Sequence, residues 1–208
     1  MQHSKASYWN QQRSLSRRDC IGALAVAAVV PAFIRSAPAW AAEDPKFDVA
    51  KLSWRVFSRD DLGFSVELPR EPEISDGVNV DELPGYSFKY VAAEVRFDVV
   101  SFNVAVRELA GRGPITAAEG PKLLDAMGNA VQTGKEEGMQ SGFVRLTMNG
   151  CPGREDTVRG KDDFRLTYRT VVCGGRLIQA AAMWVSRGDT DPAVERFLRS
   201  FKLLPGQR

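Results

Sequence analysis

Histidine is almost absent from this chain of 208 residues. The one histidine is His3, so residues 42–208 contain none. Serine and cysteine hydrolases commonly use histidine as their general base, and histidine is the commonest metal ligand in proteins. The glycines also lack the spacing of a phosphate-binding loop. We therefore expect a non-catalytic protein, with no catalytic residue, no cofactor and no metal site.

The sequence also lacks an apolar run long enough to span a bilayer. The apolar run Ile21–Ile34 has 14 residues and contains Gly22 and Pro31. A membrane-spanning helix needs about 20 consecutive apolar residues. We expect no stable membrane span once this segment is removed, although an uncleaved anchor is an alternative.

A twin-arginine motif precedes this run. Ser16, Arg17 and Arg18 lie before it, and small residues including Ala39 and Ala41 follow it. A basic start, an apolar centre and a small-residue end are the three parts of a signal peptide, and paired arginines indicate the twin-arginine export route. We predict a cleavable signal peptide over residues 1–41, cut after Ala41 or Ala39. The expected location is periplasmic or extracellular, with general secretory export as the alternative.

The positive charge of the chain belongs to this segment. The first 41 residues hold five of the 28 Lys and Arg and one of the 26 Asp and Glu. The remaining residues carry 23 basic and 25 acidic groups, which is a net charge of −2. We therefore expect neither a nucleic acid nor an anionic membrane as a partner.

The rest of the chain is predicted to be a flexible leader over 42–51 and a single α+β domain over 52–208. Its hydrophobic pattern is mainly that of strands, with period two. The expected strands are 52–58, 64–68, 86–91, 95–106, 143–148, 154–159, 164–172 and 176–185. A polar loop is expected over Asp76–Pro84, and Ala92–Glu94 is expected to turn a hairpin. The strand 95–106 is apolar on both faces, which indicates a sheet covered on both sides.

Two helices are expected. Thr116 and Glu119 have the spacing of a capping box, but Pro121 would then fall inside the helix. The alternative start places Gly120 as the cap and Pro121 as the first helical residue. The second helix is expected near the end of the chain, with Asp191 as its cap.

The turn at Asp162 permits an inference about the cysteines. If the hairpin turns there, opposed residues have numbers that sum to 324. Arg169 then faces Glu155, and Cys151 faces Cys173 across neighbouring strands. We predict a Cys151–Cys173 disulfide, because an exported compartment allows one to persist. Two reduced thiols, or a redox-active pair, are the alternatives.

Several polar and aromatic groups are candidates for a site. The acidic candidates are Asp60 with Asp61, Asp76 with Asn79, Asp81 and Glu82, Asp162 with Asp163, and Asp189 with Asp191. The Asp76 group offers oxygen ligands for a weak calcium site, but a solvated loop and ordinary turns are favoured. The basic candidates are Arg154, Arg159, Arg165, Arg169 and Arg176, for which a salt-bridged solvent face is favoured over an anion site. Trp54 and Trp184 are expected in the core, or else at the edge of a small-molecule pocket.

Three structural motifs resemble those of the PsbP-like superfamily. They are Gly63-Phe64-Ser65-Val66-Glu67-Leu68-Pro69 with Glu71-Pro72, Gly150-x-Pro152-Gly153-Arg154-Glu155, and Val194-x-x-Phe197-Leu198-x-Ser200-Phe201-x-Leu203. The resemblance implies an α/β/α sandwich, in which helices cover both faces of an antiparallel sheet. It also implies an assembly or interaction module, and it brings no catalytic residues.

The sequence therefore supports two functions of different classes. The favoured one is an exported, non-catalytic module that binds an envelope protein and supports assembly or stress tolerance. It predicts an exposed apolar patch. The alternative is a periplasmic protein that binds a small ligand or a metal, and it predicts a concave pocket.

Overall fold

The structure is a computed structural model that describes residues 48, 51–83, 86–111, 113–133, 139–186 and 190–206. The predicted signal peptide, with Ser16, Arg17, Arg18, Ala39 and Ala41, lies outside the described residues, as does most of the leader. Within the described part of the chain, no helix is long and apolar enough to cross a membrane.

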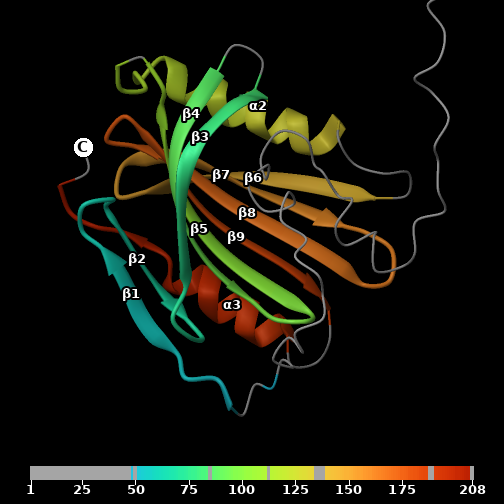
Figure 1. The fold of residues 1–208 in the computed structure, drawn as a ribbon. Helices are drawn as coiled ribbons and strands as arrows, with labels where there is room; N and C mark the ends of the chain where they lie inside the picture. Colours follow the sequence, from blue (N-terminus) through green and yellow to red (C-terminus); the bar gives the residue numbers. More distant parts are fainter. Residues whose placement is uncertain are drawn as a thin grey trace, which may run out of the picture.

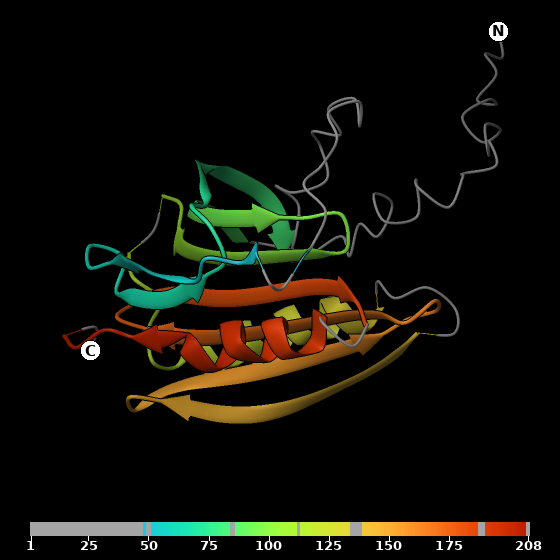
Figure 2. The same cartoon turned by 90° about the horizontal axis from the view of Figure 1, so that it is seen from below.

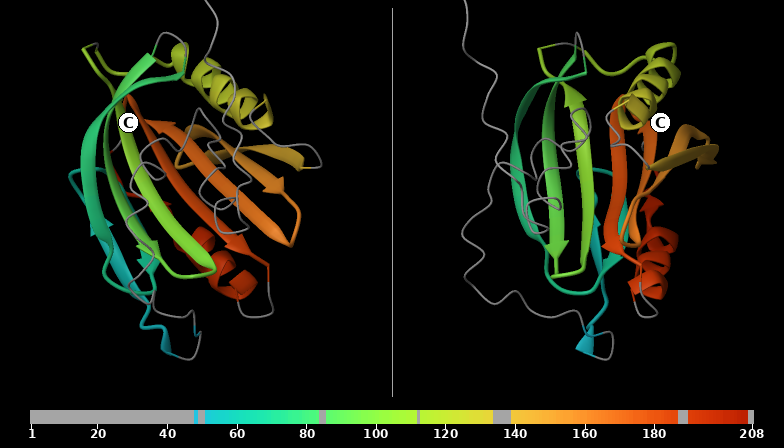
Figure 3. Two further views of the ribbon diagram at one scale, coloured as in Figure 1. Left: turned by 45° about the vertical axis from the view of Figure 1, so that its right-hand side comes forward. Right: turned by 90° about the vertical axis from the view of Figure 1, so that its right-hand side faces the viewer.

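A large antiparallel sheet of seven strands forms the centre of the fold (Figure 1). Its order is β3 (Glu73–Leu83), β4 (Tyr86–Arg96), β5 (Val100–Leu109), β9 (Arg176–Val185), β8 (Phe164–Cys173), β7 (Cys151–Arg159) and β6 (Gln140–Met148). Strands β3 and β6 are therefore the two edges, and they lie at opposite ends of the sheet (Figure 3). Strand β5 is buried along nearly all its length, as its two apolar faces predicted.

A smaller antiparallel sheet of three strands packs against one face of the large sheet. Its order is β1 (Arg55–Arg59), β2 (Phe64–Leu68) and β10 (Lys202–Leu203). Alternation along β2 explains the packing, since Phe64, Val66 and Leu68 are buried whereas Ser65 and Glu67 are less so. The three apolar side chains join one core cluster with the large sheet.

Two helices pack on opposite faces of the large sheet (Figure 2). Helix α3 (Thr190–Ser200) contributes Ala193, Val194 and Phe197 to the core cluster that also contains β2. Helix α2 (Glu119–Thr133) contributes Leu123, Leu124 and Met127 to a second cluster on the other face. The spacing of these residues is that of amphipathic helices with one apolar stripe.

The predicted α/β/α sandwich is wrong. The described residues form ten strands in two antiparallel sheets and only two helices. Beside α3, the small sheet covers the same face of the large sheet, so that face is not a helical layer. The physical reason is that β2 pairs with β1 on one side and with β10 on the other, so these strands form a sheet of their own instead of extending the large sheet.

Two segments of the predicted pattern differ from the structure. The polar loop expected over Asp76–Pro84 lies mostly within β3, where Asp76 opposes Val91 of β4. The hairpin expected at Ala92–Glu94 turns instead at Phe97–Val99, where Phe97 N donates to Val100 O at 2.8 Å. Ala92 and Ala93 continue β4, where each pairs with both β3 and β5 and its side chain is buried.

The first residues of α2 and α3 show whether each helix has the N-terminal cap that the sequence predicted. The Glu119 carboxylate accepts from Thr116 N and Oγ1 at 3.0 and 2.9 Å, so the capping box is formed. Pro121 cannot donate to the Ala117 carbonyl, which explains why the regular helix begins only at Glu119. Asp191 is not the cap of α3, because the helix already begins at Thr190. Its carboxylate accepts instead from Trp184 Nε1 at 2.6 Å.

The register of the predicted β7–β8 hairpin is confirmed. Glu155 opposes Arg169, and Arg169 Nε and Nη2 donate to Glu155 Oε2 at 2.9 and 2.6 Å. The structure contains the Cys151–Cys173 disulfide that this register predicted, with a Cα–Cα distance of 5.3 Å.

Candidate functional site

The edge strand β6 carries two exposed apolar side chains. Phe143 is 48% exposed and Val144 is 59% exposed, and no side chain of this strand is fully buried. Natural sheet edges are usually protected by lysine, proline, bulges or covering elements. Strand β6 has no lysine and no proline, and no described strand pairs with its outer side. We take β6 as the centre of the candidate site.

A two-residue turn sets which backbone groups of β6 point outward. Asn149 and Gly150 have φ values of 52° and 82°, as a type I′ hairpin requires. Such a turn is flanked by a hydrogen-bonded pair, here Met148 and Cys151. Because bonded and non-bonded pairs alternate, even-numbered residues of β6 direct their backbone groups to β7. Odd-numbered residues direct theirs away from the sheet.

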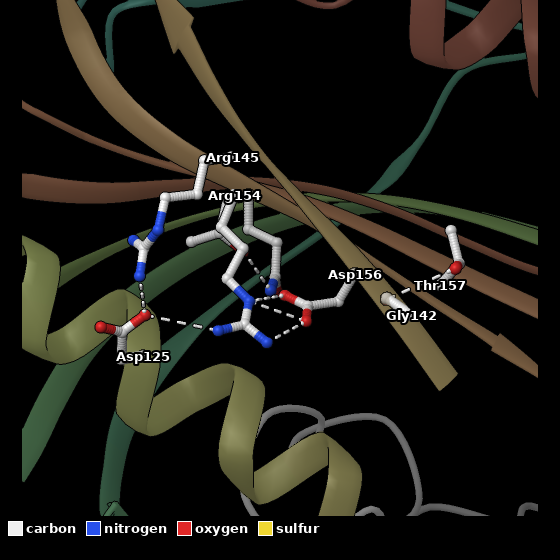
Figure 4. Close-up of polar contacts among 8 residues, drawn as sticks. Asp125, Gly142, Arg145, Arg154, Asp156 and Thr157 are labelled. Carbon is white, nitrogen blue, oxygen red and sulfur yellow. Dashed lines mark hydrogen bonds and ion pairs between the residues drawn. The ribbon is translucent and has the colours of Figure 1, made fainter. Parts of the chain in front are cut away.

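A buried ion pair lies on β7 beside this edge strand (Figure 4). Arg154 is 2% exposed and Asp156 is 6% exposed. Arg154 Nε donates to the two carboxylate oxygens of Asp156 at 2.8 and 2.9 Å, and Nη2 lies 2.7 Å from Oδ1. Both residues face α2, since the side chains of alternate residues in a strand share a face.

A second carboxylate connects this pair to α2. Arg145 Nη2 of β6 donates to Asp125 Oδ1 of α2 at 2.7 Å, and Arg154 Nη1 donates to the same oxygen at 3.4 Å. Figure 4 shows Asp125 between the two guanidinium groups. The cluster of Asp125, Arg145, Arg154 and Asp156, called the Arg154 cluster below, therefore connects β6, β7 and α2.

The guanidinium of Arg154 is enclosed on two further sides. Its Cζ lies 3.8 Å from the centre of the Phe143 ring, within the range of cation–π contacts. On α2, a Cβ placed on Gly128 would lie 2.1 Å from the same Cζ. Glycine at 128 therefore gives the guanidinium its space, and the guanidinium supports the inner face of Phe143.

Burial changes the titration of this cluster. Desolvation raises the pKa of Asp156 above its usual value, while hydrogen bonding and attraction from Arg154 oppose that shift. Burial also raises the pKa of Tyr168 on the neighbouring strand β8, and the charge of Asp156 adds to that shift. Arg154 thus favours the ionised form of the buried Asp156 carboxyl group.

Substituting alanine for Gly128 is expected to lower the free energy of unfolding by about 1–3 kcal/mol, because the new methyl group displaces the Arg154 guanidinium. Helix propensity alone would have the opposite effect, because alanine stabilises a helix by up to about 1 kcal/mol relative to glycine. Urea unfolding measures it. Gly113→Ala is the matched control, since no atom lies within 4 Å of its Cβ position. Equal stability of G128A and wild type would contradict the prediction.

The structure separates the arginines that the sequence grouped together. Arg154 is buried under α2, whereas Arg169 pairs with Glu155 on the opposite face. Arg176 Nε lies 2.8 Å from Glu108 Oε1, and Arg165 lies 3.8 Å from Asp163. The expectation of a single solvent face is therefore wrong for Arg154. Alternation along β7 determines this outcome.

The acidic candidates do not converge. Asp61 is paired with Arg59 at 2.6 Å, and this hydrogen bond lowers the pKa of Asp61. Asp162 and Asp163 are turn residues with φ values of 53° and 60°. Among the described residues, no group of three or more His, Cys, Asp or Glu side chains is placed to hold a metal. Asp189 and the side chains of Asn79, Asp81 and Glu82 lie outside the described residues.

Neither Trp54 nor Trp184 lines the groove that the described residues form between α3 and β2. Trp54 packs edge-on against Phe102 at 5.9 Å, and the Arg196 guanidinium lies 4.8 Å from the Trp54 ring centre. The groove has a volume of about 490 Å³. Four of its charged side chains form two ion pairs, Arg196 with Glu67 at 2.6 Å and Arg199 with Glu195 at 2.5 Å. This is a charged surface groove and differs from the enclosed pocket that a small-ligand site predicts.

Neither the Arg154 cluster nor the exposed edge of β6 was predicted from the sequence. Gly128 was the available signal for the cluster, because an isolated glycine inside a helical pattern indicates close packing or function. No sequence signal distinguished β6 as an edge strand, since Phe143, Val144 and Leu146 are compatible with an interior position.

Comparison with solved structures gives a likeness in fold. Among solved structures, the chain is similar to the solution structure of cyanobacterial PsbP (CyanoP) from Synechocystis sp. PCC 6803, with a TM-score of 0.45 and 14% identity. The match covers 73% of this chain and 93% of that chain. No family model and no curated protein matches. The neighbour bears the name of the family that the sequence motifs resemble, and at this TM-score it carries no argument about function.

Proposed function

We propose that residues 52–208 form an exported, non-catalytic protein-interaction module of the cell envelope. Its binding site is the outer edge of β6, and its ligand is an extended polypeptide segment. The twin-arginine motif supports export, and the Cys151–Cys173 disulfide is compatible with an oxidising compartment. Binding occurs by strand addition, in which backbone hydrogen bonds supply affinity and side-chain contacts supply specificity.

The exposed outer edge of β6 carries this proposal. Phe143 and Val144 place apolar surface on the two faces of the strand, beside outward-pointing backbone groups. The Arg154 cluster connects this strand to α2, so the binding edge is ordered before a ligand arrives. Preorganisation lowers the entropy lost on binding.

Photo-cross-linking in the intact envelope tests the proposed function. A photoreactive phenylalanine analogue replaces Val144 in one variant and Val56 in a matched control. Val56 is a valine of the edge strand β1 and is 72% exposed, so it is at least as accessible as Val144. We expect a discrete polypeptide adduct from position 144, and a much weaker one from position 56.

Mass spectrometry of the adduct identifies the bound polypeptide. No adduct at position 144, or equal yields at both positions, would contradict binding at β6. Unfolding midpoints of the two purified variants serve as the control for folding. Both substituted side chains are exposed, so the midpoints are expected to match that of the unsubstituted protein.

A further inference from the structure

Strand β6 has a sequence that is complementary to itself when two copies run antiparallel. Its one charged side chain is Arg145, and its bounds are Gln140 and Met148. The register that overlaps all nine residues pairs positions whose numbers sum to 288. That register places Val144 at the two-fold axis, opposite Val144 of the second copy.

We propose that the β6 edge binds a second copy of this chain, so that two large sheets join into one across a two-fold axis. This inference rests on the proposed function and names the ligand of the same site. The opposed pairs are Val144 with Val144, Phe143 with Arg145, Gly142 with Leu146, Ser141 with Thr147, and Gln140 with Met148.

Backbone geometry agrees with this register. The outward-pointing groups of β6 belong to odd-numbered residues, and a sum of 288 pairs odd residues with odd residues. Phe143 of one copy therefore exchanges two hydrogen bonds with Arg145 of the other. The Gly142 carbonyl accepts from Thr157 Oγ1 of β7 at 3.4 Å, as expected for an even residue that faces inward.

Side-chain chemistry favours the same register. The Arg145 guanidinium of one copy meets the Phe143 ring of the other, where cation–π attraction is available. Gly142 leaves room for Leu146 on the opposite face. A shift of two residues toward the turn would place Arg145 opposite Arg145, and like charges directly opposed in a sheet are destabilising. A shift of two residues in the opposite direction, away from the turn, leaves only seven of the nine β6 residues opposed to a residue of the second copy.

A charge exchange at Val144 tests the two-fold register. Val144→Glu and Val144→Lys each place like charges at the axis, so each variant alone is expected to dimerise about 10- to 100-fold more weakly than wild type. An equimolar mixture of the two should form the mixed dimer with near wild-type affinity. Sedimentation equilibrium and native mass spectrometry measure both, at up to about 500 μM because a strand-only interface is small.

Amide hydrogen exchange gives a second readout on the wild-type protein. As concentration rises, the amides of Phe143, Arg145 and Thr147 should gain protection. The amides of Val144 and Leu146 should change little, because they already face β7. An alternating pattern of this kind requires strand pairing at this edge.

The outcomes separate the two proposals. A wild-type protein that stays monomeric throughout the concentration range, or a mixture that associates no better than either variant, overturns the second-copy inference. If the position 144 adduct then contains a different polypeptide, the proposed function holds and only its ligand changes. If no adduct forms at position 144, the proposed function fails as well.

Discussion

Replacing Arg154 by methionine is expected to lower the free energy of unfolding by about 3–5 kcal/mol at neutral pH. The substitution keeps much of the side-chain volume but removes the cation that hydrogen-bonds to Asp156. Asp156 is only 6% exposed, so its charge would remain buried without its main partner. Urea unfolding of wild type and variant, followed by tryptophan fluorescence, measures the difference.

The loss is expected to grow as the pH rises. Burial already raises the pKa of Asp156 in the folded protein, and Arg154 opposes that shift, so its removal raises the pKa further. When the pKa of a carboxyl group is higher in the folded than in the unfolded protein, its contribution to stability is complete at a pH below the unfolded-state pKa. That contribution is lost as the pH rises through the folded-state pKa. The free energy of unfolding of the variant should therefore be nearest to that of wild type below pH 3.8, the usual pKa of Asp. Above that pH the difference between the two proteins should increase.

A double variant provides the control. Arg154→Met with Asp156→Leu removes both charges, and an apolar pair of similar volume often replaces a buried ion pair with little loss. We expect it to recover most of the stability and to lose the added pH dependence. A single variant with wild-type stability at neutral pH would contradict the assignment, as would a deficit that shrinks with rising pH.

Local pairing in the β7–β8 hairpin could be predicted from the sequence, whereas sheet order could not. The turn at Asp162 fixed the pairing of Glu155 with Arg169 and brought Cys151 opposite Cys173, because opposed residues of a hairpin have a constant sum. Nothing local determines that β5 pairs with β9, or that β6 is left at an edge. Those pairings join distant segments through the packing of both sheet faces.

The candidate site was missed for the same reason. The sequence indicates that Arg154 and Glu155 lie on opposite faces of a strand, but not which face α2 covers. Arg154 was therefore expected on a solvent face and is instead buried beneath Gly128. Likewise, Phe143 and Val144 become exposed only because β6 has no neighbouring strand on its outer side in the described chain.

Removing the Cys151–Cys173 disulfide is expected to lower the free energy of unfolding by about 3 kcal/mol. The bridge joins residues 22 positions apart, and in the chain-entropy model a closed loop of this size destabilises the unfolded state by about that amount. The double variant Cys151→Ala, Cys173→Ala should show this loss in urea unfolding. Its m-value should rise, because the unfolded chain without the cross-link is more expanded.

The same variant bears on export. The proposed twin-arginine export requires the domain to fold before it crosses the membrane, so the domain without its disulfide should still unfold cooperatively. Phe64, Val66 and Phe197 belong to the buried core cluster that also contains Cys151 and Cys173, and their apolar side chains remain in place of the cross-link when it is removed. The wild-type protein under reducing conditions is the control and should match the double variant. A double variant that is unfolded in the absence of urea would argue against export in a folded state. Equal stability of the oxidised protein and the variant would contradict the stabilising role of the disulfide.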